Sequence, residues 1–200
     1  MKYITIALFL MSAIMTAQEI EEKKTFEFAP KARIYAISSL NFGDNQLADA
    51  YGTNYGIGTS LSFFSLANFR PALNYELSRY QIVKPELTRA TGNSSTFWSV
   101  FGTVAYDIPI TKEVIIAPDF GIGYSQLTLG AGKTRFGNQG GTQFRAGLST
   151  NYKFASAAAV FVGVHYIYTT LQVSTHPDFE SYYNHGQQIQ FAIGFQFGKK

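Results

Sequence analysis

Apolar and polar residues alternate with a period of two along most of the chain after residue 30. The last segment shows this most clearly, with one face formed by Ile189, Phe191, Ile193, Phe195 and Phe197 and the other by Gln188, Gln190, Ala192, Gly194 and Gln196. This period is typical of a β-strand with one apolar face, because successive side chains point to opposite sides. The alternation predicts eight strands, over residues 31–40, 55–65, 70–82, 97–108, 114–127, 142–155, 158–172 and 187–198.

The connections between these strands alternate in length. Short connections (66–69, 109–113 and 156–157) are interleaved with long polar ones (41–54, 83–96, 128–141 and 173–186). An up-and-down transmembrane barrel has this asymmetry, with tight turns on the periplasmic side and longer loops outside the cell. The sequence therefore predicts an all-β fold, an eight-stranded antiparallel up-and-down transmembrane β-barrel.

The polar face of the strands distinguishes a membrane barrel from a soluble ligand-carrying barrel, which alternates in the same way. A face turned to water is rich in Lys and Glu, whereas this face is mostly Gly, Ser, Thr, Ala, Asn and Gln. Charged residues form only 14% of the chain, against roughly 25% in an ordinary soluble domain. We therefore expect the polar face to line a narrow lumen and the apolar face to contact lipid. Aromatic residues near strand ends are expected to form interfacial girdles: Trp98, Tyr80, Tyr106, Tyr124, Tyr152 and Tyr168.

The N-terminus has the pattern of a secretory signal peptide. Lys2 supplies the positive start, residues 4–14 are apolar, and Ala17 offers a small residue for cleavage before Gln18. An uncleaved anchor is the alternative, but a membrane-spanning helix needs about 20 apolar residues. The expected organisation is a signal peptide over 1–17, a periplasmic lead-in over 18–29 and an outer-membrane β-barrel domain over 30–200. This organisation places the protein in the outer membrane of a Gram-negative-type cell.

Over residues 30–200 the chain resembles the small outer-membrane β-barrels related to the barrel half of the OmpA family, and in particular porin-family or PorT-like barrels. The resemblance rests on the leader, the eight alternating strands, the unequal connections and the aromatic-rich last strand. It implies a place in the cell envelope among outer-membrane lipid and lipopolysaccharide. For the PorT-like barrels it also implies an accessory role in an export or assembly system. Such barrels commonly end on an aromatic residue, whereas here Gly198, Lys199 and Lys200 follow Phe197.

Four charged or titratable residues have the parity to face the lumen: Glu76, Asp119, Arg145 and His165. One interpretation is a polar gate or a narrow ion path. The other is a structural plug of paired charges, because the interior of an eight-stranded barrel is just wide enough for side chains to fill. A charge in such a space needs a partner, and this size argument favours the plug.

Two patterns invite an enzymatic or metal-binding interpretation. Some eight-stranded barrels cleave an acyl ester of lipid A with a His and a Ser at the outer rim. Here His165 lies at mid-strand with inward parity, and Ile167 stands where that Ser would be. The last long loop carries metal-ligating side chains at a spacing that matches no established site: His176, Asp178, Glu180 and His185. We therefore expect no enzymatic activity, no cofactor and no metal.

The predicted function is a non-enzymatic outer-membrane barrel with a filled lumen that presents four external loops to a partner. The residues expected to make such contacts are His176, Asp178, Phe179, Tyr182 and Tyr183. The first alternative is an accessory component of an outer-membrane export or assembly system, and the second is a narrow channel or a lipid-modifying enzyme. Nucleic acid is not an expected partner, because the basic residues are scattered and the formal net charge is only +3. The sequence does not define an oligomeric state.

Overall fold

The computed structural model describes residues 26–88, 93–131, 134–173 and 175–198. The predicted signal peptide and most of the predicted lead-in lie outside the described residues. The long strands are β1 (Glu27–Phe42), β2 (Tyr51–Ser65), β3 (Phe69–Ile82), β4 (Ser94–Tyr106), β6 (Val114–Ala131), β7 (Thr134–Ala155), β8 (Ala158–Thr170) and β9 (His185–Gly198). The short elements are β5 (Ile108–Pro109), α2 (Gln46–Ala50), α3 (Pro85–Thr88) and α4 (Pro177–Tyr183).

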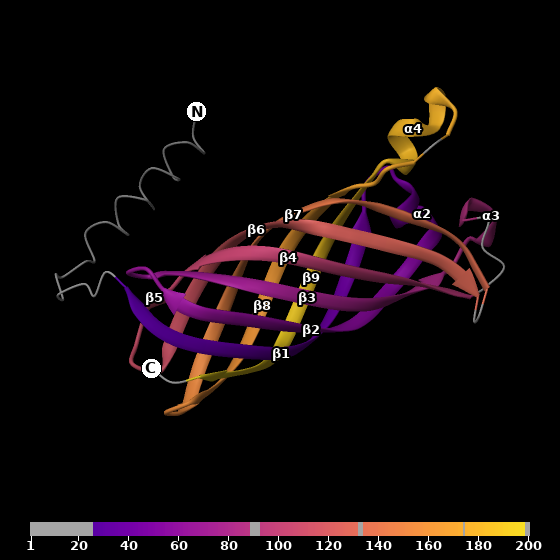
Figure 1. The fold of residues 1–200 in the computed structure, drawn as a ribbon. Helices are drawn as coiled ribbons and strands as arrows, with labels where there is room; N and C mark the ends of the chain where they lie inside the picture. Colours follow the sequence, from indigo (N-terminus) through magenta and orange to yellow (C-terminus); the bar gives the residue numbers. More distant parts are fainter. Residues whose placement is uncertain (1–25, 89–92, 132–133, 174, 199–200) are drawn as a thin grey trace, which may run out of the picture.

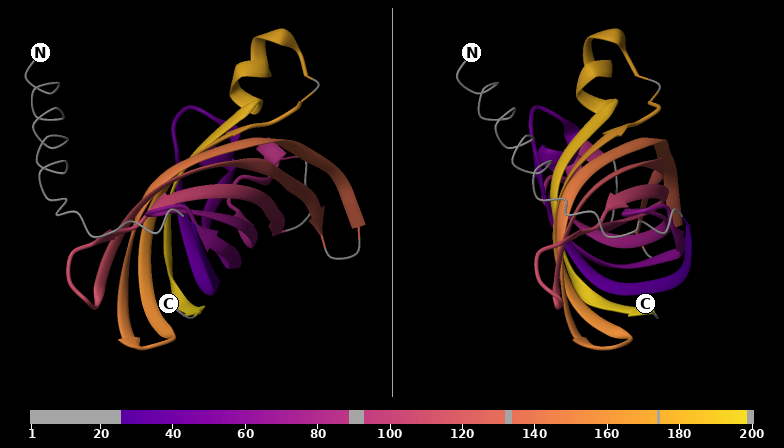
Figure 2. Two further views of the ribbon diagram at one scale, coloured as in Figure 1. Left: turned by 60° about the vertical axis from the view of Figure 1, so that its left-hand side comes forward. Right: turned by 90° about the vertical axis from the view of Figure 1, so that its left-hand side faces the viewer.

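The eight long strands close into a barrel (Figures 1 and 2). Strands adjacent in sequence pair antiparallel, β4 pairs directly with β6, and β1 pairs with β9 to close the sheet. The two-residue β5 only extends the edge of β6 near a turn. The predicted fold class, an eight-stranded antiparallel up-and-down barrel, is therefore confirmed.

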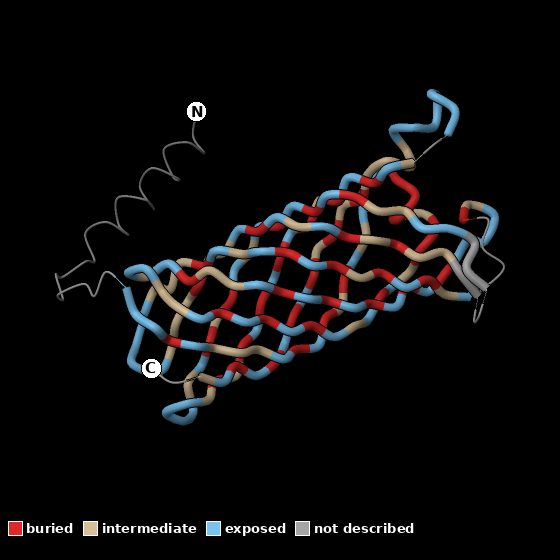
Figure 3. Tube along the Cα trace, in the orientation of Figure 1, coloured by how far each residue is buried: buried red, intermediate tan, exposed pale blue. Residues whose placement is uncertain are grey.

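Burial alternates residue by residue along the strands (Figure 3). In β3, Leu73 and Tyr75 are 60% and 46% exposed. Asn74 and Glu76, which alternate with them along the strand, are buried. The buried face is polar and the exposed face is apolar, which is the reverse of a water-soluble barrel. This arrangement suits a barrel surrounded by hydrocarbon, since closure also satisfies the backbone hydrogen bonds that lipid cannot.

The two ends of the barrel differ as the connection lengths predict. At one end, which we call the turn end, lie the connections 66–68, 107–113 and 156–157 together with the start of β1 and the end of β9. The opposite end, which we call the loop end, carries α2, α3 and α4 (Figure 1). Within the described segments, no helix combines the length and the apolar character needed to cross a bilayer.

The prediction of a third long loop over residues 128–141 is largely wrong. β6 runs to Ala131 and β7 begins at Thr134, so most of this stretch is a paired ribbon that extends beyond the loop end. Its Gly- and Asn-rich composition resembles a loop, but a ribbon needs only backbone pairing, and a register shift between Leu129 and Gly130 accommodates the irregularity. β1 likewise begins at Glu27, inside the predicted lead-in.

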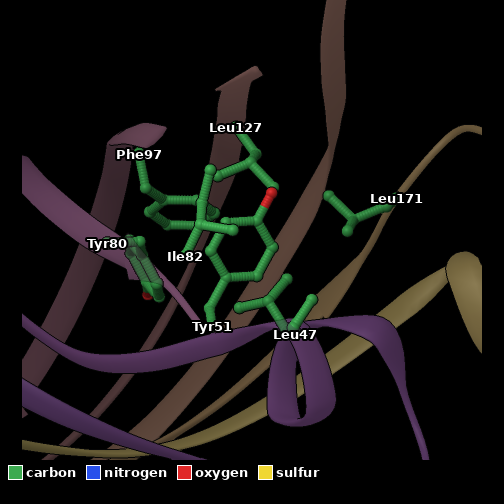
Figure 4. Packing of buried hydrophobic residues seen from close by; sticks show 8 residues of the cluster. Leu47, Tyr51, Tyr80, Ile82, Phe97, Leu127 and Leu171 are labelled. Carbon is green, nitrogen blue, oxygen red and sulfur yellow. The ribbon is translucent and has the colours of Figure 1, made fainter. Parts of the chain in front are cut away.

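An apolar cluster fills the lumen near the loop end (Figure 4). It comprises Leu47, Ala50, Tyr51, Tyr80, Ile82, Phe97, Leu127 and Leu171. The expectation that Tyr80 belongs to an interfacial girdle is therefore wrong, because it shares the inward parity of Glu76 and is 1% exposed. Its ring packs against Tyr51 and Phe97 at centroid distances of 5.8 and 5.5 Å.

The other five girdle candidates have outward parity. Trp98, Tyr124 and Tyr168 lie toward the loop end, and the rings of Trp98 and Tyr124 are 5.7 Å apart. Tyr106 and Tyr152 lie toward the turn end, where Tyr106 packs on Phe69 at 4.9 Å. Aromatic residues thus flank the apolar belt at both levels, as expected at the two interfaces of a bilayer.

Candidate functional site: the lumen and the loop-end cap

A four-residue network crosses the middle of the lumen. Arg145 of β7 donates from Nη1 to Glu76 Oε1 of β3 (3.0 Å) and from Nη2 to Gln190 Oε1 of β9 (2.7 Å). Gln190 Nε2 and Tyr35 Oη donate to the two oxygens of Glu76, each at 3.0 Å. Glu76 and Arg145 are each 4% exposed, and the Arg145 guanidinium also stacks on Phe101 at 4.3 Å. The charges are therefore paired and enclosed, as a buried ion pair requires.

Glycines make room for the largest members of the lumen. Tyr35 is paired with Gly58 on β2 and with Gly194 on β9. A Cβ at either position would collide with the Tyr35 side chain or backbone. Gly58 and Gly194 thus leave the space that the Tyr35 side chain occupies.

Asp119 and His165 form a second, separate pair, with His165 Nε2 3.1 Å from Asp119 Oδ2. The structure therefore distributes the four lumen residues singled out from the sequence into two pairs. Sequence reasoning missed Tyr35 and Gln190, which complete the first pair, because neither carries a charge. It also missed Arg33 of β1, which donates to Gln196 (2.9 Å) and Asn151 (2.8 Å).

A third charged group lies at the turn end. Arg70 donates to both oxygens of Asp107, at 3.0 and 2.8 Å, and Lys31 Nζ lies 3.6 Å from the same carboxylate. Burial by itself would raise the pKa of Asp107, but the hydrogen bonds and positive charge of Arg70 outweigh it and hold that pKa below its ordinary value.

This pair gives the barrel an acid-sensitive contact. A carboxyl group with a depressed pKa contributes stability above its unfolded pKa of about 4, and that contribution is lost as the pH falls through the folded pKa. Unfolding by urea at pH 7 and pH 3 should therefore show a loss of stability on acidification that is smaller in Asp107→Asn. Glu113→Gln, an exposed change at the same end, is the control. An unchanged pH dependence in Asp107→Asn would contradict the assignment.

Three short helices form a cap over the loop end. Asn45 begins α2 by accepting a hydrogen bond from the Ala48 amide at 3.0 Å, and Gln46 Nε2 donates to the carbonyl of Leu87 in α3 at 2.8 Å. Tyr182 of α4 donates to Asp49 of α2 at 2.9 Å. Partial burial, together with this hydrogen bond and the charge of Asp49, raises the pKa of Tyr182 to about 12. These contacts join loops that are distant in sequence.

The cap borders a partly open hollow of about 860 Å³, a size typical of small-molecule sites. Its walls combine apolar and polar side chains: Gln46, Glu86, Leu87, Thr88, Leu129, Gln139, Val173, Thr175, His176, Phe179 and Tyr183. Of the contact residues predicted from the sequence, His176, Phe179 and Tyr183 line this hollow. Asp178 is exposed beside His176, and Tyr182 is engaged with Asp49.

The described residues contain no group of three or more His, Asp or Glu side chains close enough to hold a metal ion. His176 Nδ1 lies 3.3 Å from Asp178 Oδ2, and His185 contacts Asn184 and the ring of Tyr168 instead. His165 is 8% exposed and faces the lumen, as does Ile167. The hypothesis of a lipid-facing His and Ser pair therefore finds no support at His165.

The closed antiparallel barrel, its apolar outer belt and its polar lumen define the class: a small eight-stranded outer-membrane β-barrel. Solved structures agree with this class. Neisserial surface protein A (NspA) matches with a TM-score of 0.58 at 13% identity, covering 88% of this chain and 99% of that one. OprG of Pseudomonas aeruginosa matches with a TM-score of 0.50 at 11% identity, covering 88% and 96%. The sequence matches no protein-family model and no curated protein. The likeness concerns the fold alone.

Proposed function

We propose that this protein is a non-enzymatic outer-membrane barrel with a closed lumen that recognises an external partner through its loop-end cap. The observation that carries the proposal is the position of the apolar cluster, which seals the lumen directly beneath the hollow of the cap. A ligand in the hollow would meet a floor that includes Leu87, Leu129 and Val173, the residues packed against that cluster. The barrel then serves as a rigid base for a recognition surface.

The closed lumen argues against a channel. Beneath the apolar cluster lies the Glu76–Arg145 network, and the lumen cavity beside it has a volume of only about 40 Å³. Water-filled channels belong to barrels with many more strands. Reconstituted into a planar bilayer, the protein should give no steady ionic current above the bare membrane, and a stable ohmic conductance would overturn this part of the proposal.

The cap surface supports recognition of a protein or glycan. Phe179 is 57% exposed at the edge of the hollow, and Tyr183 lies beside it on the same helix. Aromatic side chains of this kind provide large contact areas in recognition sites. Because lipopolysaccharide surrounds any barrel in this membrane, its sugars are one candidate. A partner protein of the envelope is the other.

A photocrosslinking amino acid in the cap tests this proposal in living cells. We expect a crosslinker at Phe179 to give a discrete adduct, whereas one at Ile110, equally exposed at the turn end, should not give the same product. An adduct that migrates as lipopolysaccharide would identify the glycan, and a protein adduct would identify a partner. Co-purification of a large export complex through that adduct would favour the accessory role. No adduct, or the same adduct from Ile110, would count against a recognition role for the cap.

The proposal includes export through a cleaved leader. The charged start, the apolar run and Ala17 support cleavage before Gln18. The intact mass of the protein purified from outer membranes would identify the mature N-terminus, and retention of Met1 would exclude cleavage.

A further inference from the structure

Apart from the apolar cluster, the described part of the lumen carries more positive than negative charge. The inward positions of the described strands and turns hold five cations, Lys31, Arg33, Arg70, Arg145 and Lys153, and three carboxylates, Glu76, Asp107 and Asp119. Arg145 is paired with Glu76, and Arg70 shares Asp107 with Lys31. Asp119 is engaged by His165.

Within the described part of the chain, Arg33 has no carboxylate at ion-pair distance, and Asp107 and Asp119 act on its charge only from farther away. Every hydrogen bond that the described part of the chain gives its guanidinium ends on a neutral amide, Gln196 Oε1 at 2.9 Å or Asn151 Oδ1 at 2.8 Å. Its plane lies over the Phe161 ring at 4.5 Å, which holds it in place. A charge enclosed in this way is costly unless an opposite charge compensates it.

Arg33 also borders a small cavity whose lining is cationic. The lining includes three arginines, Arg33, Arg70 and Arg145, together with His165 and a single acidic residue, Asp119. The cavity volume of about 40 Å³ corresponds to roughly three water molecules. Arg145, one of the lining residues, is 4% exposed. Its buried Nε makes no hydrogen bond within the described part of the chain.

We propose that this cavity is a binding site for a monatomic anion of the halide class, held by Arg33 with Arg70 and Arg145. These three side chains already border the cavity, so binding requires no rearrangement of the strands. The small volume favours chloride or bromide over a tetrahedral oxyanion with its hydration. A bound halide would act as a structural counter-ion for Arg33, which lies on β1.

The test compares unfolding by urea of the detergent-purified full chain in sodium chloride and in sodium gluconate at equal ionic strength. A ligand that binds only the folded state raises the folding equilibrium constant roughly tenfold for each tenfold rise in its concentration above its dissociation constant. We expect a rise in the urea midpoint that grows with the logarithm of the chloride concentration and that Arg33→Gln abolishes. Arg79→Gln, a change on an exposed arginine bonded to Ser94, should retain it.

Equal midpoints in the two salts would overturn the proposal, as would a chloride effect that persists in Arg33→Gln. If Arg33→Gln does not fold, crystals of the unmodified protein grown in bromide decide the matter. An anomalous peak within contact distance of Arg33 supports the site. A bromide-free cavity at saturating bromide refutes it.

Discussion

Replacing Arg145 with methionine will lower the free energy of unfolding by about 3–5 kcal/mol, the range measured when one partner of a buried ion pair is removed. Arg145→Met leaves the Glu76 carboxylate in the lumen without its cation, and it also removes the hydrogen bond to Gln190 and the stacking on Phe101. Trp98 is the sole tryptophan of the chain, so its fluorescence reports unfolding directly.

The double variant Glu76→Gln with Arg145→Met is the matched control. Because it removes both charges, its loss of stability should be smaller than the sum of the two single losses. Additive losses would show that the two residues do not depend on each other. That result would contradict the ion pair as the element that joins β3 to β7 across the lumen.

Replacing Tyr51 with alanine will also destabilise the barrel by about 3–5 kcal/mol, as expected for truncation of a buried aromatic ring. Tyr51 is 2% exposed and lies in the apolar cluster, where its ring meets Tyr80 edge to face. The void left behind is enclosed by Leu47, Phe97 and Leu127, which cannot collapse into it without moving strands.

Tyr55→Ala provides the control in the same strand. Tyr55 is 65% exposed on the lipid face, so its loss should change stability by less than about 1 kcal/mol. Similar effects of the two variants would mean that the apolar cluster does not contribute to the packing of the lumen. Urea unfolding followed by Trp98 fluorescence and circular dichroism measures both.

The strands and their inward faces could be predicted because parity alone decides which side a residue faces. β7 and β9 alternate cleanly, and their buried residues are those of the predicted polar face. β1 alternates poorly because Tyr35 and Ile37 point inward despite being apolar, where they pack with Phe161 and Ala192. Tyr80 was assigned wrongly for the same reason, since a lumen that contains apolar side chains weakens the contrast between its two faces.

The partners within the lumen could not be predicted, because they depend on register and barrel closure. Glu76 and Arg145 are 69 residues apart in the sequence. Only the pairing of all intervening strands brings them to the same height along the barrel axis. The cap is also beyond sequence reasoning, because Asp49 and Tyr182 come from the first and last long loops. Arg33 has no acidic residue close to it in the sequence, and the residues opposite it on the neighbouring strands are Ser60 and Gln196. No local pattern therefore indicates its role.

The pairing of β1 with β9 has a consequence for how the molecule forms. Lys31 is aligned with Gly198, so the open edge of β1 is covered only when β9, the last of the described strands, pairs with it. Contacts of such long range slow folding, and a nascent or truncated chain that lacks β9 exposes two unpaired edges. Closure of the barrel therefore depends on β9, and changes that weaken this strand are expected to leave the edge of β1 open.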